Sequence, residues 1–325
     1  ASKLLSTAGS SRPYVMSALE ANARSKQNAH SEFLLRLADN ALILSHRLSE
    51  WTGHGPALEE DIALTNIALD LLGQARMLYT RAGALTNPVC DEDALAYFRN
   101  PDAFRNVTAL ELPNSGVHAA RGATGDYAFT ILRQSLFSAY MLELWPLVAS
   151  SDDEVLAGIA MKAIKETRYH WRHASDWTIR LGDGTASSNQ RMQAALDSFF
   201  PYTNEWFALD AIDARALQQS LKALALTSDA LDDEPRPMTQ TPWHRPDEER
   251  TPEEAFLTKT AAVLAKHLHQ RWLTQIEALF EQAHLRLPPP SQLQTRGRYG
   301  CHGEHLSLLL AEMQSVARAH PGASW

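Results

Sequence analysis

Apolar residues recur along most of this chain at spacings of three and four, which is the period of an amphipathic helix. Strand-like alternation is scarce, and 15 glycines are few for 325 residues. The pattern predicts an all-α protein. Long helices are expected over residues 32–51, 58–82, 126–149 and 153–181, and further helices over 88–99, 188–200, 211–226, 252–285 and 303–319.

Breaks between these segments indicate how the first four helices pack. Gly53, Gly55 and Pro56 form a short loop, which predicts an antiparallel pair of helices on either side of it. Residues 100–124 are rich in proline and glycine and are expected to form a long irregular crossover. Pro146 should kink the third helix or end its regular part. The expected unit is therefore a four-helix bundle with additional C-terminal helices.

Two of the helices carry a polar stripe inside an apolar face. On the helix over 58–82, the stripe consists of Asn66, Asp70 and Gln74 at spacings of four residues. On the helix over 153–181, it consists of Lys162, Glu166, His170 and His173. The helix over 32–51 has no carboxylate centred in its apolar stripe, where Asn40 is the nearest polar residue.

Inward carboxylates and histidines on two helices are typical of a ferritin-like di-iron scaffold, which needs Glu-x-x-His on each of two helices. Here the corresponding positions read Asp70-Leu-Leu-Gly73 and Glu166-Thr-Arg-Tyr169. Glu143, on the apolar face of the third helix, would be a further carboxylate. We therefore predict a vestigial centre at Asp70, Glu143, Glu166 and His170, with no metal, no cofactor and no catalytic residue.

A buried carboxylate that has lost its metal needs another positive partner. Lys162 lies one turn before Glu166 on the same face, so it is expected to replace the charge of the metal. Other interpretations stay open. Asp70 can belong to a polar ladder across the bundle, and Glu143 can bond a neighbouring tyrosine or arginine.

Histidines also occur near the C-terminus, where His302 and His305 flank Glu304. A metal cluster is conceivable there, but a contact between this helix start and the bundle or a partner is the favoured interpretation. The large side chains of Trp51, Trp145, Trp171 and Trp177 suggest more aromatic surface than one core can hide. We expect that surface to pair with another subunit.

Composition adds limits on domains, partners and compartment. The net charge of −8 argues against nucleic-acid binding. Cys90 and Cys301 give no disulfide framework, which favours the cytoplasm, and no apolar run approaches the roughly 18 residues that a membrane helix needs. Residues 1–31 are expected to be a disordered extension and residues 32–325 a single helical domain, in which the acidic, proline-rich segment 228–252 is a mobile loop.

Three segments carry a family resemblance: Leu48–Leu78, Lys162–Thr185 and Gly303–Trp325. They closely resemble the C subunits of bacterial phenylacetyl-CoA epoxidases, and the resemblance covers about residues 32–225 and 253–325. It implies a ferritin-like, non-catalytic structural subunit of a multicomponent di-iron oxygenase that epoxidises the ring of phenylacetyl-CoA in aerobic phenylacetate degradation.

The resemblance also implies partners and a cofactor outside this chain. In that family the di-iron centre and the binding site for the CoA ester belong to the A subunit, and the system is completed by an iron–sulfur flavin reductase and a B subunit. A hetero-oligomer with the A subunit, including self-association within the complex, is expected. Two alternatives stay open: an active di-iron oxidase that uses Asp70, Glu143, Glu166 and His170, and a free-standing acyl-CoA-binding helical protein.

Overall fold

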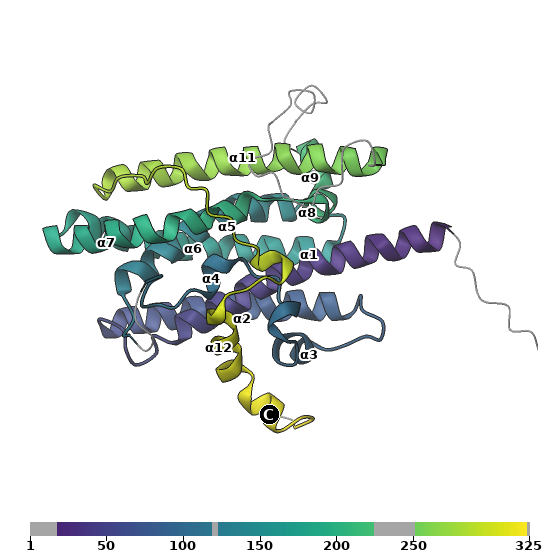
Figure 1. Ribbon diagram of the computed structural model, residues 1–325, viewed down its shortest axis with the longest axis horizontal. Coiled ribbons are helices and arrows are strands. Elements are labelled where there is room, and N and C mark those ends of the chain that lie inside the picture. The colour runs from purple at the N-terminus through teal and green to yellow at the C-terminus, as the bar shows by residue number, and fades with distance from the viewer. Residues whose placement is uncertain (1–17, 119–122, 224–250, 324–325) are drawn as a thin grey trace, which may run out of the picture.

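The structure, a computed structural model, describes residues 18–118, 123–223 and 251–323 (Figure 1). Within these ranges the chain is helical, and its one extended pairing is an isolated bridge between Arg296 and Cys301. The predicted all-α class is therefore confirmed. The helices are α1 (Ala18–Ser49), α2 (Leu58–Gly83), α3 (Glu92–Tyr97), η1 (Pro101–Ala103), α4 (Thr108–Glu111), α5 (Tyr127–Val148), α6 (Glu154–Asp183), α7 (Ala186–Phe199), η2 (Phe200–Phe207), α8 (Ala211–Ala216), α9 (Gln218–Ala223), α11 (Pro252–Gln282), η4 (Gly297–Tyr299), α12 (Glu304–Met313) and α13 (Ser315–Ala319).

Four long helices, α1, α2, α5 and α6, surround a common centre, because residues from all four line one interior cavity. The pairs α1–α2, α5–α6 and α2–α6 are in direct contact. In Figure 1 the long helices run along the long axis of the molecule, and α11 lies on the opposite side of the stack from α1 and α2. The segment that follows α11 then crosses the molecule to reach α12.

Helix α5 is the central element of the fold. It contacts α6, α7 and α11, and most of its residues are buried. This explains why its sequence is apolar nearly all round rather than on one stripe. Asp126 caps its first turn by accepting a hydrogen bond from the Ala128 amide, and the helix continues two residues beyond Pro146.

The N-terminal boundary differs from the prediction. Helix α1 begins at Ala18, so residues 18–31 belong to it rather than to a disordered extension. This stretch holds four alanines and one residue each of Leu, Glu, Arg, Lys and Gln, all of them good helix formers, and that propensity outweighs the Ser/Ala-rich composition that suggested disorder. Residues 1–17 and most of the predicted loop 228–252 lie outside the described residues.

The prediction that these tryptophans form an exposed aromatic surface is wrong. Trp51 and Trp145 are buried in the core, and Trp171 and Trp177 are partly buried against it. The indole of Trp51 donates a hydrogen bond to Oγ1 of Thr130 at 3.0 Å. These rings pack in or against one contiguous core, whose residues come from elements between α1 and α12. A chain of this length can bury a core of that size.

Candidate functional site at the bundle centre

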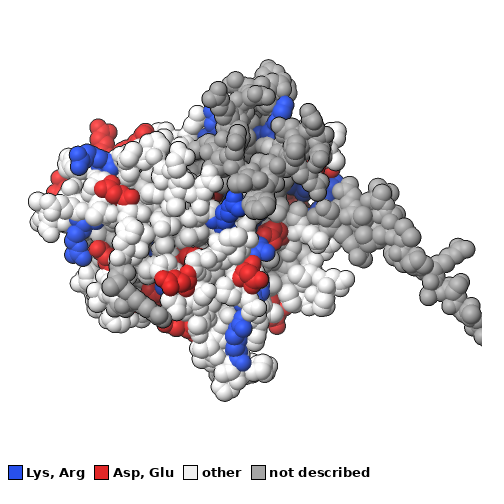
Figure 2. Space-filling view, in the orientation of Figure 1, with Lys and Arg blue, Asp and Glu red and all other residues white. Residues whose placement is uncertain are grey.

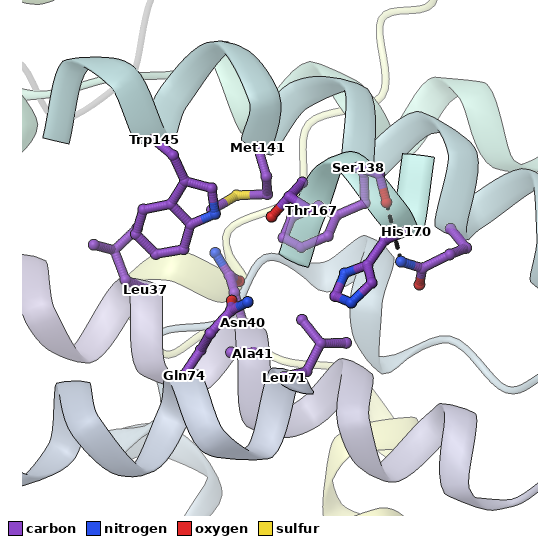
Figure 3. A pocket seen from close by; sticks show the side chains of 12 residues that line it. Leu37, Asn40, Ala41, Leu71, Gln74, Ser138, Met141, Trp145, Thr167 and His170 are labelled. Atoms are coloured by element: carbon purple, nitrogen blue, oxygen red, sulfur yellow. Dashed lines mark hydrogen bonds between the residues drawn. The ribbon is translucent and has the colours of Figure 1, made fainter. Parts of the chain in front are cut away.

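The interior cavity lies where the four long helices meet (Figure 3). It has room for about one water molecule. Its lining comes from all four helices: Leu37, Asn40 and Ala41 of α1, Leu71 and Gln74 of α2, Gln134, Phe137, Ser138, Met141 and Trp145 of α5, and Thr167 and His170 of α6. Helix bundles that bind metal build the site in the bundle core from side chains on facing helices.

The helix register at this centre differs by one residue from the predicted one. The inward-facing pairs at i, i+3 are Leu71 with Gln74 on α2 and Thr167 with His170 on α6. A Cβ added at Gly73 would meet no heavy atom within 4 Å, and Tyr169 is exposed. The positions Gly73 and Tyr169, which the sequence pattern assigned to missing histidines, therefore face away from the centre.

Asp70 and His170 do come together, as the stripes predicted. His170 is buried, and its Nε2 donates a hydrogen bond to Oδ2 of Asp70 at 3.1 Å. The Asp70 side chain is 38% exposed, so this carboxylate lies at the edge of the bundle rather than at its centre. The pair joins α2 to α6.

A second link between α2 and α6 involves Glu166. Gln74 donates from Nε2 to one oxygen of Glu166 at 2.8 Å, and Lys162 Nζ lies 2.9 Å from the other oxygen. Lys162 thus pairs with Glu166 as predicted, but its side chain is 55% exposed. The expected burial of the lysine is therefore wrong, although its ammonium still neutralises Glu166, whose side chain is only 15% exposed.

A third link joins His173 to Glu60. His173 Nε2 lies 2.8 Å from Oε2 of Glu60, which also accepts a hydrogen bond from the Tyr127 hydroxyl at 2.6 Å. Burial raises the pKa of Glu60, but the hydrogen bonds from Tyr127 and His173 outweigh burial and hold that pKa below its ordinary value. This third link holds the start of α2 against α6 and α5.

Glu143 does not join the centre, so the prediction that placed it there is wrong. Its carboxylate forms an ion pair with Arg271 of α11, which is the arginine-bonded alternative. The α5 residues that do face the cavity include Ser138, Met141 and Trp145. The apolar face of α5 is too wide to tell from sequence alone which side chains face α11 and which face the centre.

The residues at the centre do not fit a di-iron cluster. Such a cluster needs four carboxylates and two imidazoles, and its two ions lie roughly 3.5–4 Å apart. The cavity lining supplies one imidazole, His170, and no carboxylate. In the part of the chain that the structure describes, no group of three or more His, Cys, Asp and Glu residues is arranged to hold a metal.

Sequence reasoning missed a fully buried carboxylate on α1. Asp39 forms an ion pair with Arg99, accepts a hydrogen bond from the Tyr79 hydroxyl, and accepts one from the Arg105 amide at 2.6 Å. Burial and the charge of Asp39 raise the pKa of Tyr79 well above its ordinary value. These partners lie 40 to 66 positions away in sequence, so no local pattern reveals them.

Buried charges also hold the C-terminal segment. Arg36 and Arg298 both pair with Asp213, at 2.9 and 2.8 Å. His302 Nδ1 donates to Glu111 at 2.7 Å, and its Nε2 donates to the Phe104 carbonyl at 3.1 Å. His302 thus contacts α4 and the crossover, while Arg47 of α1 donates to the carbonyl of His305 at 3.3 Å, so the expected contact between this helix start and the bundle is confirmed.

The surface is mixed in charge on the face shown in Figure 2, where acidic and basic side chains are scattered among uncharged ones. Among the described helices, none is both long enough and apolar enough to cross a bilayer.

Comparison with known proteins gives the family. Residues 14–325 match the family model of phenylacetic acid catabolic proteins, which covers both PaaA and PaaC chains. The chain belongs to this family. It is also 37% identical over 298 residues to the C subunit of the 1,2-phenylacetyl-CoA epoxidase of Escherichia coli strain K12, and the match covers 92% of this chain and 100% of the relative. The resemblance carried by Leu48–Leu78 and the two later segments is thereby confirmed.

Proposed function

We propose that this chain is the non-catalytic C subunit of a phenylacetyl-CoA epoxidase of ferritin-like architecture and that it supports a catalytic A subunit. The side chains at the bundle centre carry this proposal. Where a di-iron oxygenase needs carboxylates, this chain has Leu71 and Thr167, and where it needs a second imidazole it has Gln74. The reaction is accordingly assigned to a partner that holds the metal and binds the CoA ester.

An outward-facing apolar surface on α2 and α6 supports the pairing. We call Ile62, Leu69, Met161 and Tyr169 the α2–α6 face; all four side chains are exposed. Glycines open the same two helices to close approach, because a Cβ added at Gly73 or Gly158 would meet nothing within 4 Å. We propose that these side chains are covered by another protein, because binding to a partner would remove their apolar surface from water.

The matching family model includes A-type chains, so the proposed partner is a related helical bundle. Two bundles can dock through helix faces, and close approach is easiest where side chains are small. We therefore propose that the α2–α6 face is covered by the A subunit. The reductase and the B subunit would complete the system. The free thiols of Cys90 and Cys301 suit a cytoplasmic location.

Copurification tests this proposal. The chain is coexpressed with an A subunit of the same system, and the complex is measured by size-exclusion chromatography and phenylacetyl-CoA epoxidation. We expect a stable hetero-oligomer with iron in the A subunit. The double variant Leu69→Asp/Met161→Asp should abolish it, while Val316→Asp, at an equally exposed apolar position on α13, should not. Separate species at micromolar concentration, or stoichiometric iron with epoxidation by this chain alone, would overturn the proposal.

A further inference from the structure

A buried amide faces the cavity with one atom unpaired. Gln134 is 1% exposed, and its Nε2 donates to Oγ of Ser138 at 3.0 Å. Its Oε1 is buried and accepts no hydrogen bond from any residue that the structure describes. A buried acceptor without a donor has lost its hydration and gained nothing in return, so such groups in folded proteins nearly always have a partner.

The cavity walls combine apolar side chains with polar side chains that carry no formal charge, and the apolar part comes from Leu37, Ala41, Leu71, Phe137, Met141 and Trp145. Asn40, Gln74, Ser138, Thr167 and His170 line the cavity together with Gln134, and no lysine, arginine or carboxylate does. Figure 3 shows Ser138 and His170 at the same end of the cavity. Mg²⁺, Ca²⁺ and the transition metals require carboxylate, thiolate or several imidazole ligands, so these walls suit a neutral ligand.

Size limits the ligand further. The cavity has room for about one water molecule, and a buried water forms two to four hydrogen bonds to otherwise unsatisfied polar groups. We propose that the centre of the bundle, where metal-binding relatives of this architecture hold iron, is a binding site for one ordered water molecule that donates a hydrogen bond to Oε1 of Gln134.

The indole nitrogen of Trp145 is also buried and unpaired among the described residues. Positions 134 and 145 are three helical turns apart, about 16 Å along α5, and we assign the proposed water to Gln134, whose amide bonds Ser138. The proposed water site is the end of the cavity that holds Ser138, the partner of Gln134, together with His170, whereas Trp145 lies at the other end.

A crystal structure at a resolution near 1.5 Å tests the proposal. We expect a well-ordered peak in the cavity within about 3.2 Å of Gln134 Oε1 in the wild-type protein. In Gln134→Met the peak should disappear. In the matched control Met141→Leu, which alters an apolar wall, it should persist. The electron-density map of the wild-type protein alone shows whether the water is present. The proposal can therefore be tested even if Gln134→Met does not fold.

Two results would overturn the proposal. The first is a wild-type cavity without density beside Gln134, or with the Gln134 amide turned to a protein donor. The second is an anomalous scattering peak at this position in crystals soaked with Fe²⁺ or Zn²⁺, which would show that the centre binds a cation. Failure in either form leaves the proposed pairing with an A subunit untouched, because that pairing depends on the outer face of α2 and α6.

Discussion

His170 and Asp70 join the inside of the bundle to its edge: the imidazole faces the central cavity, and its Nε2 donates at 3.1 Å to a carboxylate that water also reaches. The two residues should therefore differ in what their loss does. His170 is buried, so removing it leaves a cavity, whereas water can take the place of the Asp70 oxygen.

We predict that His170→Ala lowers the free energy of unfolding by about 2 kcal/mol or more, as expected for a new core cavity. Asp70→Ala should lower it by less than about 1 kcal/mol, as expected for a partly exposed ion pair. Urea unfolding of the two variants measures both values. An equal or larger loss in Asp70→Ala would show that the carboxylate, rather than the ring, anchors this contact.

Lys162 provides a second prediction. The spacing of Lys162 and Glu166 alone suggests a buried pair, whose disruption from one side would cost about 3–5 kcal/mol. Since the lysine side chain is 55% exposed, Lys162→Met should change stability by only about 0.5 kcal/mol, the usual contribution of an i, i+4 pair on a helix surface. A double-mutant cycle with Glu166→Leu checks the coupling. A coupling energy near 3 kcal/mol would contradict the solvated lysine.

Glu166 and Gln74 both lie on the predicted polar stripes and bond each other. Local sequence patterns therefore predicted much of this site, but they did not predict which side chains face its centre. Spacings of three and four residues identified the helices and the stripes, because period 3.6 is a local property. The same spacing cannot determine the rotation of a helix to better than one residue. Asp70 and Leu71 are separated by about 100° on α2, and only the packing of α2 against α1 and α6 decides which of them faces inward. The partners of Glu143 and Asp39 depend on such packing: the sequence left an arginine open as one partner of Glu143, but spacing identified neither Arg271 nor the partners of Asp39.

The corrected register predicts where a metal site can be rebuilt. The triple variant Leu71→Glu, Gln74→His and Thr167→Glu, with the native His170, places two Glu-x-x-His motifs toward the cavity. We expect it to bind Co²⁺ with the visible absorption of a protein-coordinated ion, and its Tm to rise when metal is added. Without metal it should be less stable than wild type, because it then buries unpaired carboxylates.

A matched variant uses the register that sequence spacing suggested. Gly73→His with Tyr169→His, in the presence of native Asp70 and Glu166, creates motifs of the same spacing one position away, on the outer side of the helices. It should bind Co²⁺ weakly or not at all and show no rise in Tm. Tighter binding by this double variant than by the triple variant would mean that the inward register is wrong.

His302 predicts a pH dependence. Both ring nitrogens meet acceptors, a carboxylate oxygen of Glu111 and the carbonyl of Phe104, so the ring is a protonated double donor. Burial lowers the pKa of His302, but the hydrogen bond and charge of Glu111 outweigh burial and raise that pKa above its ordinary value of about 6.5. Because folding raises the pKa of His302, the protonated ring contributes its full stabilisation of the folded protein below pH 6.5. This stabilisation is lost as the pH rises through the pKa of the folded state.

The difference in unfolding free energy between wild type and His302→Gln isolates this residue from the other titrating groups. We expect that difference to be largest below pH 6.5 and to shrink as the pH is raised toward 9, because the neutral imidazole can no longer donate to both Glu111 and Phe104. His284→Gln is the control, since the His284 ring pairs with Asp183 at an exposed position and its loss should change the unfolding free energy only a little. A wild-type advantage over His302→Gln that grows with pH would reverse the sign and show that His302 is neutral in the folded protein.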